Sequence, residues 1–183
     1  MKELSLNILD IAENSVKAGA ALVTLTLTEA PEARTLCIAD DGCGMPPEMV
    51  RQVTDPFCTT RTTRKVGMGL PLLKLAAEQT GGHLTVTSRT READPEHHGT
   101  EVRAVFDPRH IDCVPLGNVT ETLVTLIQGH PETDFVWLHR LSPEKTVRLD
   151  TRELRQVLGE VPLNSFEVLQ WIRDYLDEQY AVG

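Results

Sequence analysis

The chain has 183 residues and a mass of 20.3 kDa, enough for one large hydrophobic core or for a domain of about 100 residues with a smaller companion. The net charge of −9 and the isoelectric point near 5.1 argue against a surface that neutralises nucleic-acid phosphates. No apolar run approaches the roughly 18 residues of a membrane span, and the four cysteines lack CxxC spacing. We therefore expect a cytoplasmic protein with reduced thiols that binds neither nucleic acid nor membrane.

The first part of the chain alternates between helical and strand periodicity. Apolar spacing predicts a helix that ends near Gly19, and alternating Leu, Val and Thr predict strands on either side of Pro31. The same reasoning predicts, in order, a short helix opened by prolines, an irregular stretch, a helix and two strands, at 45–53, 54–69, 70–82, 83–90 and 100–107. This order is typical of an α+β fold, a two-layer sandwich with helices on one face of a mixed, mostly antiparallel sheet.

Between Pro108 and Pro115 the periodic pattern of apolar residues is interrupted, and a different pattern follows. Further helices and strands are predicted at 118–129, 133–141, 145–149, 150–159 and 164–180, with Asp150 and Asn164 as helix N-caps. Residues 1–109 carry 12 basic and 15 acidic side chains, and residues 110–183 carry 6 and 12, a charge of −3 against −6. We therefore divide the chain into a first domain, 1–109, and a small α/β C-terminal domain, 110–183.

Aromatic residues of the second part have strand or helix spacing, which favours a place in the core over a ligand platform. They are Phe135, Trp137, Phe166, Trp171 and Tyr175.

Polar and glycine segments of the first part have the residue types of a nucleotide site, although each alone has an ordinary explanation. Asp10, Asn14 and Lys17 fall on one helix face, where a carboxylate, an amide and an ammonium suit Mg²⁺ and phosphates. The alternative is a solvated polar stripe. "DDGCGM" at 40–45 is also common turn chemistry, and "GMGL" at 67–70 opens a helix whose N-terminus favours an anion. The polar run at 59–65 is consistent with either a basic flap that closes over phosphates or an ordinary solvent-exposed segment.

Five ordered segments resemble the N, G1, F, G2 and G3 boxes of the GHKL superfamily, which includes the ATP-binding domains of gyrase, heat-shock chaperones, histidine kinases and MutL. They are "NILDIAENSVKAGA", "IADDGCGM", "DPFCTTR", "GMGLPLLKLAAEQTGG" and "GTEVRAVF". The resemblance covers about residues 1–109. Features typical of histidine kinases are more numerous than those typical of MutL or gyrase.

The resemblance implies ATP and Mg²⁺ as cofactors and gives each matching residue a role. Asn14 would coordinate Mg²⁺ and Asp40 would accept a hydrogen bond from the adenine amino group, while Asp41 would merely be solvated. Lys17 would contact phosphate, and Asp10 would be a possible general base. The other implied binding residues are Gly42, Gly44, Met45, Arg61, Gly67, Met68, Gly69, Leu70 and Thr100.

Two departures from the superfamily pattern bear on activity. Its hydrolysing members place a Glu four residues before the Mg²⁺-binding Asn, whereas this chain has the shorter Asp10, which favours slow hydrolysis. Glu13 points elsewhere on the helix. No histidine precedes the N box, and the six histidines downstream lack a helical phosphoacceptor context.

These features favour a stand-alone protein kinase or slow ATPase whose acceptor lies on a protein partner. The alternative is a non-catalytic switch in which ATP changes how the chain docks on that partner.

Overall fold

The structure is a computed structural model that describes residues 3–55 and 68–182. Local sequence patterns account for the order of its elements, since the expected helices and strands are all found within one to three residues of their expected ends. In chain order they are α1 (Leu4–Lys17), β1 (Leu22–Glu29), β2 (Arg34–Asp40), α2 (Pro47–Gln52), α3 (Gly69–Gln79), β3 (His83–Arg89), β4 (Gly99–Phe106), α4 (Val119–Gly129), β5 (Asp134–Arg140), β6 (Thr146–Asp150), α5 (Thr151–Leu158) and α6 (Phe166–Ala181).

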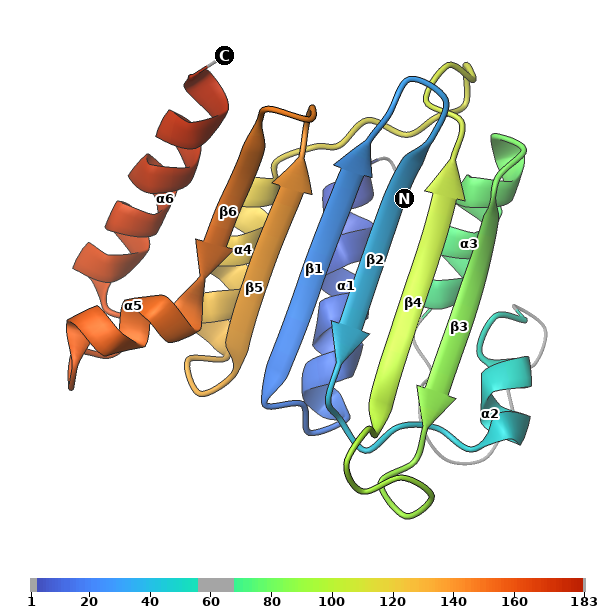
Figure 1. Cartoon of the computed structure of the whole chain (residues 1–183), viewed down its shortest axis with the longest axis horizontal. Coiled ribbons are helices and arrows are strands. Elements are labelled where there is room, and N and C mark those ends of the chain that lie inside the picture. The colour runs from blue at the N-terminus through green and yellow to red at the C-terminus, as the bar shows by residue number, and fades with distance from the viewer. Residues whose placement is uncertain (1–2, 56–67, 183) are drawn as a thin grey trace.

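The strands of the described residues form one six-stranded sheet in the order β3-β4-β2-β1-β5-β6 (Figure 1). Neighbouring strands are antiparallel except for β1 and β5, which pair in parallel from Leu22 opposite Asp134 to Thr28 opposite Arg140. A parallel pair needs a crossover connection, and α4 lies in the segment that returns the chain to β5. The expected mixed, mostly antiparallel sheet is confirmed.

Helices α1, α3 and α4 cover one face of this sheet and lie behind it in Figure 1. Period-2 alternation in β1 explains the two faces, since Val23, Leu25 and Leu27 are fully buried while the threonines between them face the other side. On α1, helical spacing puts Leu4 and Ile8 into the same core. The expected helices on one face of the sheet are therefore present.

Residues 110–182 extend this sheet and its core. Strand β5 is hydrogen bonded to β1, and Phe135 and Trp137 on β5 are fully buried in the same apolar cluster as α1 and β1. The boundary expected after residue 109 falls in the connection between β4 and α4, and as a domain boundary it stays a prediction.

Two expectations for the second part are wrong. Phe166 is 75% exposed and Trp171 is 48% exposed, so these aromatic residues lie on the surface of α6, whose buried stripe is formed by Val168, Leu169, Ile172 and Leu176. Helix α6 begins after Ser165 and not after Asn164, because residues 162–165 close a turn of their own. Asp150 is confirmed as an N-cap, accepting a hydrogen bond from the Arg152 N–H at 3.0 Å.

None of the helices in the described ranges combines the length and the hydropathy that crossing a membrane would require.

Candidate nucleotide-binding site

Helix α1 presents three polar side chains along one side. Asp10 and Lys17 are exposed and Asn14 is half-buried, and no ion pair or side-chain hydrogen bond joins any of them to another residue of the described part of the chain. An amide, a carboxylate and an ammonium therefore remain available to a ligand along about two turns of helix.

Glu13, next to this polar stripe on α1, is engaged in a contact with the protein itself. Its carboxylate lies 2.8 Å from Nε2 of His130, the C-cap residue of α4. This contact directs the Glu13 carboxylate toward the end of α4, and the expectation that Glu13 does not substitute for Asp10 stays a prediction.

Asp40 is the last residue of β2, and both oxygens of its carboxylate accept hydrogen bonds. The hydroxyl of Ser15 on α1 donates to Oδ2 at 2.7 Å, and the backbone N–H of Gly42 donates to Oδ1 at 2.9 Å. A carboxylate has about four acceptor positions, so two remain for another donor. Ser15 is 4% exposed, and its hydroxyl therefore acts on Asp40 from inside the protein.

Close backbone approaches explain the glycines after Asp40. A Cβ at Gly42 would lie 3.0 Å from both the Cβ and the carbonyl oxygen of Ala18. Gly44 has a φ of +71°, and a Cβ there would overlap the carbonyl group of Arg89. The expected role of these glycines toward a base is untested, but the turn itself already requires them.

Asp41 is not merely solvated, contrary to expectation. Its Oδ1 accepts hydrogen bonds from the N–H groups of Ala21 and Leu22 at 2.8 and 2.9 Å. These donors precede and begin β1, so Asp41 fastens the start of β1 to the end of β2. The two neighbouring aspartates thus have different tasks, one structural and one with free acceptor capacity.

The first turn of α3 lies against α1 at Asp10. Gly69 is buried, and a Cβ there would lie 3.1 Å from Cβ and 3.7 Å from Oδ2 of Asp10. The N-cap residue Met68 offers no side-chain hydrogen bond, whereas Leu70 is buried in the core. Free N–H groups and the helix dipole favour an anion at this end. The glycine lets that end approach the polar side of α1.

Thr100 lies directly opposite Asp40 in the β2–β4 pairing. Its Oγ1 is 2.8 Å from Oγ of Ser88, which accepts from the N–H of Met45 at 2.8 Å and donates to the Gly99 carbonyl at 2.9 Å. The hydroxyl pair thus links the turn after β2 to β3 and β4. Of the expected binding residues, this hydrogen-bonded group contains Thr100 and Met45.

Sequence reasoning missed three residues that shape the site, namely Ser15, Ser88 and His98. His98 places Nδ1 2.6 Å from the carbonyl oxygen of Gly42; because a carbonyl only accepts, Nδ1 is the protonated nitrogen. Ser15 follows Asn14 within the quoted N box and could have been noticed there. For Ser88 and His98 the sequence carries no comparable signal.

Arg61 and Gly67 lie outside the described residues, as do the polar run at 59–65 and all of "DPFCTTR" except Asp55. Within the described ranges no group of three or more His, Cys, Asp and Glu side chains is placed to hold a metal ion. A site with one protein oxygen, such as the Asn14 amide, is compatible with that finding, because Mg²⁺ retains waters and takes its other oxygens from phosphates.

This fold and this arrangement define the class of protein. The family model described as "Histidine kinase-, DNA gyrase B-, and HSP90-like ATPase" matches residues 1–110, and the chain belongs to this family. It therefore contains an ATP-binding domain of the GHKL type, as the five boxes indicated.

Curated relatives match the same part of the chain. A putative sensor histidine kinase NtrY-like protein of Rickettsia felis is 25% identical over 113 residues, 61% of this chain and 18% of the relative. The sensory histidine kinase/phosphatase NtrB of Rhizobium meliloti is 36% identical over 70 residues, 38% of this chain and 16% of the relative. The chain thus spans less than a fifth of the length of these relatives.

Among solved structures, the Aquifex aeolicus MutL ATPase domain complexed with ADP is similar with a TM-score of 0.56 and 12% identity. The similarity covers 95% of this chain and 88% of that one. At this identity it shows the fold alone, but it includes the part of the chain beyond residue 110.

Proposed function

We propose that the chain binds Mg²⁺ and ATP between α1, the end of β2 and the start of α3, and acts as a regulatory protein kinase or slow ATPase. The observation that carries the proposal is the Asp40 carboxylate, which Ser15 and Gly42 orient while two of its acceptor positions stay open. Membership of the ATPase family supports it.

The proposed roles of the residues are those that the family resemblance implies, and the positions of their functional groups are compatible with them. Asp40 accepts a hydrogen bond from the adenine amino group, and the Asn14 amide oxygen is a ligand for Mg²⁺. Lys17 and the N–H groups of the first turn of α3 bind phosphate oxygens, so positive charge surrounds them from two elements. Bound Mg·ATP supplies the phosphoryl group.

In this proposal the Asp10 side chain limits the rate at which water hydrolyses ATP. It lies beside Gly69 at the start of α3, on the side of α1 that carries Asn14. Its side chain is one methylene shorter than Glu, and a general base needs heavy-atom reach of about 2.6 to 3.2 Å. We therefore propose low turnover with water.

The phosphoacceptor is proposed to lie on a protein outside residues 1–183. All six histidines fall in the described ranges and none lies within a helix. His98, His130 and His139 are within hydrogen-bonding distance of groups of the chain itself.

A second candidate function, a nucleotide-dependent switch without catalysis, is favoured by the packing of α1. On one side α1 carries Asp10 and Asn14. On the other, the Ser5 carbonyl accepts a hydrogen bond from the Thr122 hydroxyl at 3.3 Å, and Glu13 contacts His130. A shift of α1 on nucleotide binding would therefore reach α4 and the C-terminal part.

The test of nucleotide binding compares two neighbouring carboxylates by calorimetry with Mg·ATP. Asp40→Asn should weaken binding at least about tenfold, because a lost charged hydrogen bond is worth roughly 1.5 to 3 kcal/mol. Asp41→Asn is the matched control, since the amide retains an oxygen for the Ala21 and Leu22 N–H groups. Unchanged affinity in Asp40→Asn would refute the assigned adenine contact.

Transfer and switching are separated by incubating the protein with Mg·ATP labelled in its γ-phosphate, with and without cell extract. Label on an extract protein supports the kinase. Slow release of labelled phosphate supports the ATPase, whereas tight binding with neither release nor transfer supports the switch. Asp10→Asn should suppress the release and spare the binding.

A further inference from the structure

Strand β6 is one edge of the sheet, and its outward groups can be identified from the hairpin that precedes it. The Leu141 N–H donates to the Lys145 carbonyl at 2.9 Å, which makes this a hydrogen-bonded pair. Pairs alternate along an antiparallel ladder, so Thr146 and Arg148, opposite Arg140 and Leu138, direct their N–H and C=O groups away from β5.

Gln179 on α6 occupies this edge at Arg148 as a neighbouring strand would. Its side-chain oxygen accepts from the Arg148 N–H at 3.0 Å, and its side-chain nitrogen donates to the Arg148 carbonyl at 3.0 Å. A backbone residue of an added strand makes the same two bonds. Gln179 therefore satisfies the edge at Arg148, and an added chain would have to use the outward groups next to it.

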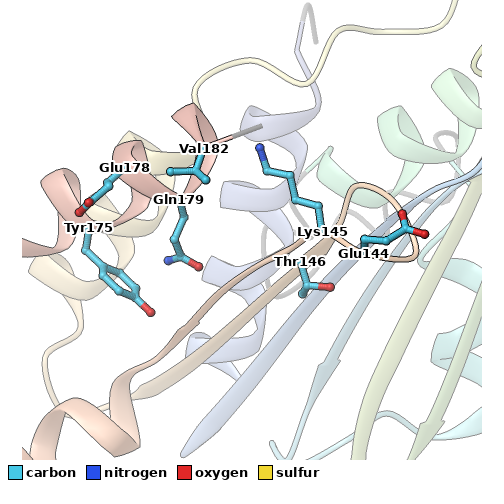
Figure 2. Close-up of a pocket in the computed structure, with 7 residues that line it drawn as sticks. All are labelled: Glu144, Lys145, Thr146, Tyr175, Glu178, Gln179 and Val182. Atoms are coloured by element: carbon cyan, nitrogen blue, oxygen red, sulfur yellow. The ribbon is translucent and has the colours of Figure 1, made fainter.

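The next outward residue, Thr146, has no such cover. Within the described part of the chain its outward N–H and C=O have no partner, and Thr146 lines a hollow of about 410 Å³ between the β5–β6 hairpin and α6 (Figure 2). Hairpin residues Glu144, Lys145 and Thr146 form one side of this hollow, and α6 residues form the other. The residues on the α6 side are Tyr175, Glu178 and Gln179, with the C-cap residue Val182.

An aromatic surface continues the hollow along α6. The rings of Tyr175 and Trp171 are stacked, with centroids 4.8 Å apart and an interplanar angle of 13°, and Trp171 is 48% exposed. Exposed stacked aromatic rings give apolar contact area to a bound chain at little cost in conformational entropy.

The side chains that line the hollow carry a net negative charge. Glu144 and Glu178 contribute two carboxylates against the single ammonium of Lys145, which donates to the Tyr180 carbonyl at 3.2 Å. The Arg148 guanidinium forms an ion pair with Glu153, donating two hydrogen bonds of 2.9 and 2.6 Å. A positively charged chain is therefore the complementary occupant.

We propose that the β6 edge and the adjoining face of α6 bind an extended, basic segment of a partner protein, which pairs with Thr146 as an additional strand and rests on Tyr175 and Trp171. A second copy of this chain is disfavoured as the occupant, because it would place acidic surfaces against each other. This site lies at the sheet edge opposite β3 and far from Asp40 along the strand order, so it is separate from the proposed nucleotide site.

The experiment follows the amide signals of isotopically labelled protein by NMR, without nucleotide, while a capped peptide of alternating lysine and valine is added. The Thr146 amide should shift and become protected from exchange. A peptide with glutamate in place of lysine, and a lysine–valine peptide with alternate backbone nitrogens methylated, should not produce this change.

Thr146→Pro removes the outward N–H without breaking a ladder hydrogen bond, and the first residue of an edge strand tolerates proline. It should weaken peptide binding about tenfold, as the loss of one or two backbone hydrogen bonds implies, whereas Thr146→Val should bind as the native chain does. Glu178→Lys, an exposed change on α6, should also weaken binding of the lysine peptide and is independent of the backbone of β6.

Three results would overturn the proposal. The lysine peptide could leave the Thr146 amide unchanged, or the glutamate peptide could bind equally well. The protein alone could also form dimers whose Thr146 signal depends on concentration, which would make a second copy the occupant. None of these results would bear on nucleotide binding, which the calorimetry measures separately.

Discussion

The proposed nucleotide site and the β5–α6 region both contain clustered polar side chains, but the hydrogen bonding of these side chains differs. Near Asp40, the side chains of Asp10, Asn14 and Lys17 form no ion pair or hydrogen bond with described residues. In the β5–α6 region polar groups are bonded to one another. The Trp137 indole N–H and the His139 Nδ1 both contact the Tyr180 hydroxyl, at 3.2 and 2.9 Å.

The Tyr180 hydroxyl oxygen accepts a hydrogen bond from the Trp137 indole N–H, because an indole N–H can only donate. Its second hydrogen bond joins it to His139 Nδ1. Nε2 lies 3.4 Å from Glu29 Oε1, within reach of an ion pair but not aligned as a hydrogen bond. Burial raises the pKa of Glu29, but His139 and Arg34 outweigh it and hold the pKa below its usual value.

A polar cluster is informative about ligand binding when its side chains retain unused hydrogen-bonding capacity. The Glu29–His139–Tyr180 cluster has the residue types of a catalytic relay, yet His139 is 1% exposed and burial raises the pKa of Tyr180 to about 12. Its members contact one another and join β1, β5 and α6. Asp10, Asn14 and Lys17 have no such partners among the described residues, and substitutions in the two regions test this difference.

The largest effect is expected from Trp137→Ala. Trp137 is fully buried where β5 joins β1, and truncation of such a side chain costs about 3 to 5 kcal/mol. Because β1 and β5 share one core, the free energy of unfolding should fall for the whole chain. Denaturant unfolding, with hydrogen exchange of β2 and β5 amides as regional probes, measures it.

Trp171→Ala is the matched control, since Trp171 is 48% exposed and a surface change alters stability by only about 0.5 kcal/mol. If β2 amides kept their protection in Trp137→Ala while β5 amides lost theirs, the second part would be an independent domain, as the boundary after residue 109 predicts.

A smaller, pH-dependent effect is expected from Tyr180. The folded chain keeps the phenol proton up to about pH 12, whereas an unfolded tyrosine releases it near pH 10. Between these values the unfolded state binds fewer protons, so the free energy of unfolding falls as pH rises, by roughly 1.4 kcal/mol per pH unit.

Tyr180→Phe isolates this contribution in urea unfolding across the alkaline range. Below about pH 10 the variant should be less stable by roughly 1 to 3 kcal/mol, because the Trp137 N–H and His139 Nδ1 lose their partner. As pH rises the difference between the two proteins should narrow, since only the native chain has this phenol to titrate. A constant difference would show that Tyr180 titrates alike in both states.

Most of the fold could be predicted because its determinants are local. Alternating Val, Leu and Thr define β1, and the apolar spacing of Leu4, Ile8 and Ile11 defines α1. The pairing of β5 with β1 could not be read in this way, because strand partners far apart in sequence are chosen by packing. The same limit explains Phe166 and Trp171, whose helical spacing does not reveal which side of α6 meets the core.

The arrangement of the candidate site could be predicted where its residues stand together in a short motif. Asp40, Gly42 and Gly44 stand together in one segment, and the structure gives each a geometric reason. Ser88 and His98 come from β3 and the loop before β4, and only folding brings them to Met45 and Gly42. The tasks of Asp40 and Asp41 likewise depend on which backbone groups each carboxylate meets.

The smallest effect, and the sharpest test of how Asp40 is prepared for a ligand, is expected from Ser15→Ala. The Ser15 hydroxyl donates to Asp40 Oδ2 at 2.7 Å, and Ser15 is only 4% exposed. A net contribution of about 1 kcal/mol from this hydrogen bond implies that Mg·ATP affinity falls about fivefold when it is lost. Thr125→Ala is the control, because it removes a hydroxyl that bonds only the Glu121 carbonyl on exposed α4 surface. If calorimetry found the affinity of Ser15→Ala unchanged while Asp40→Asn lost it, the carboxylate would need no support from α1, and the link between the two elements would be structural only.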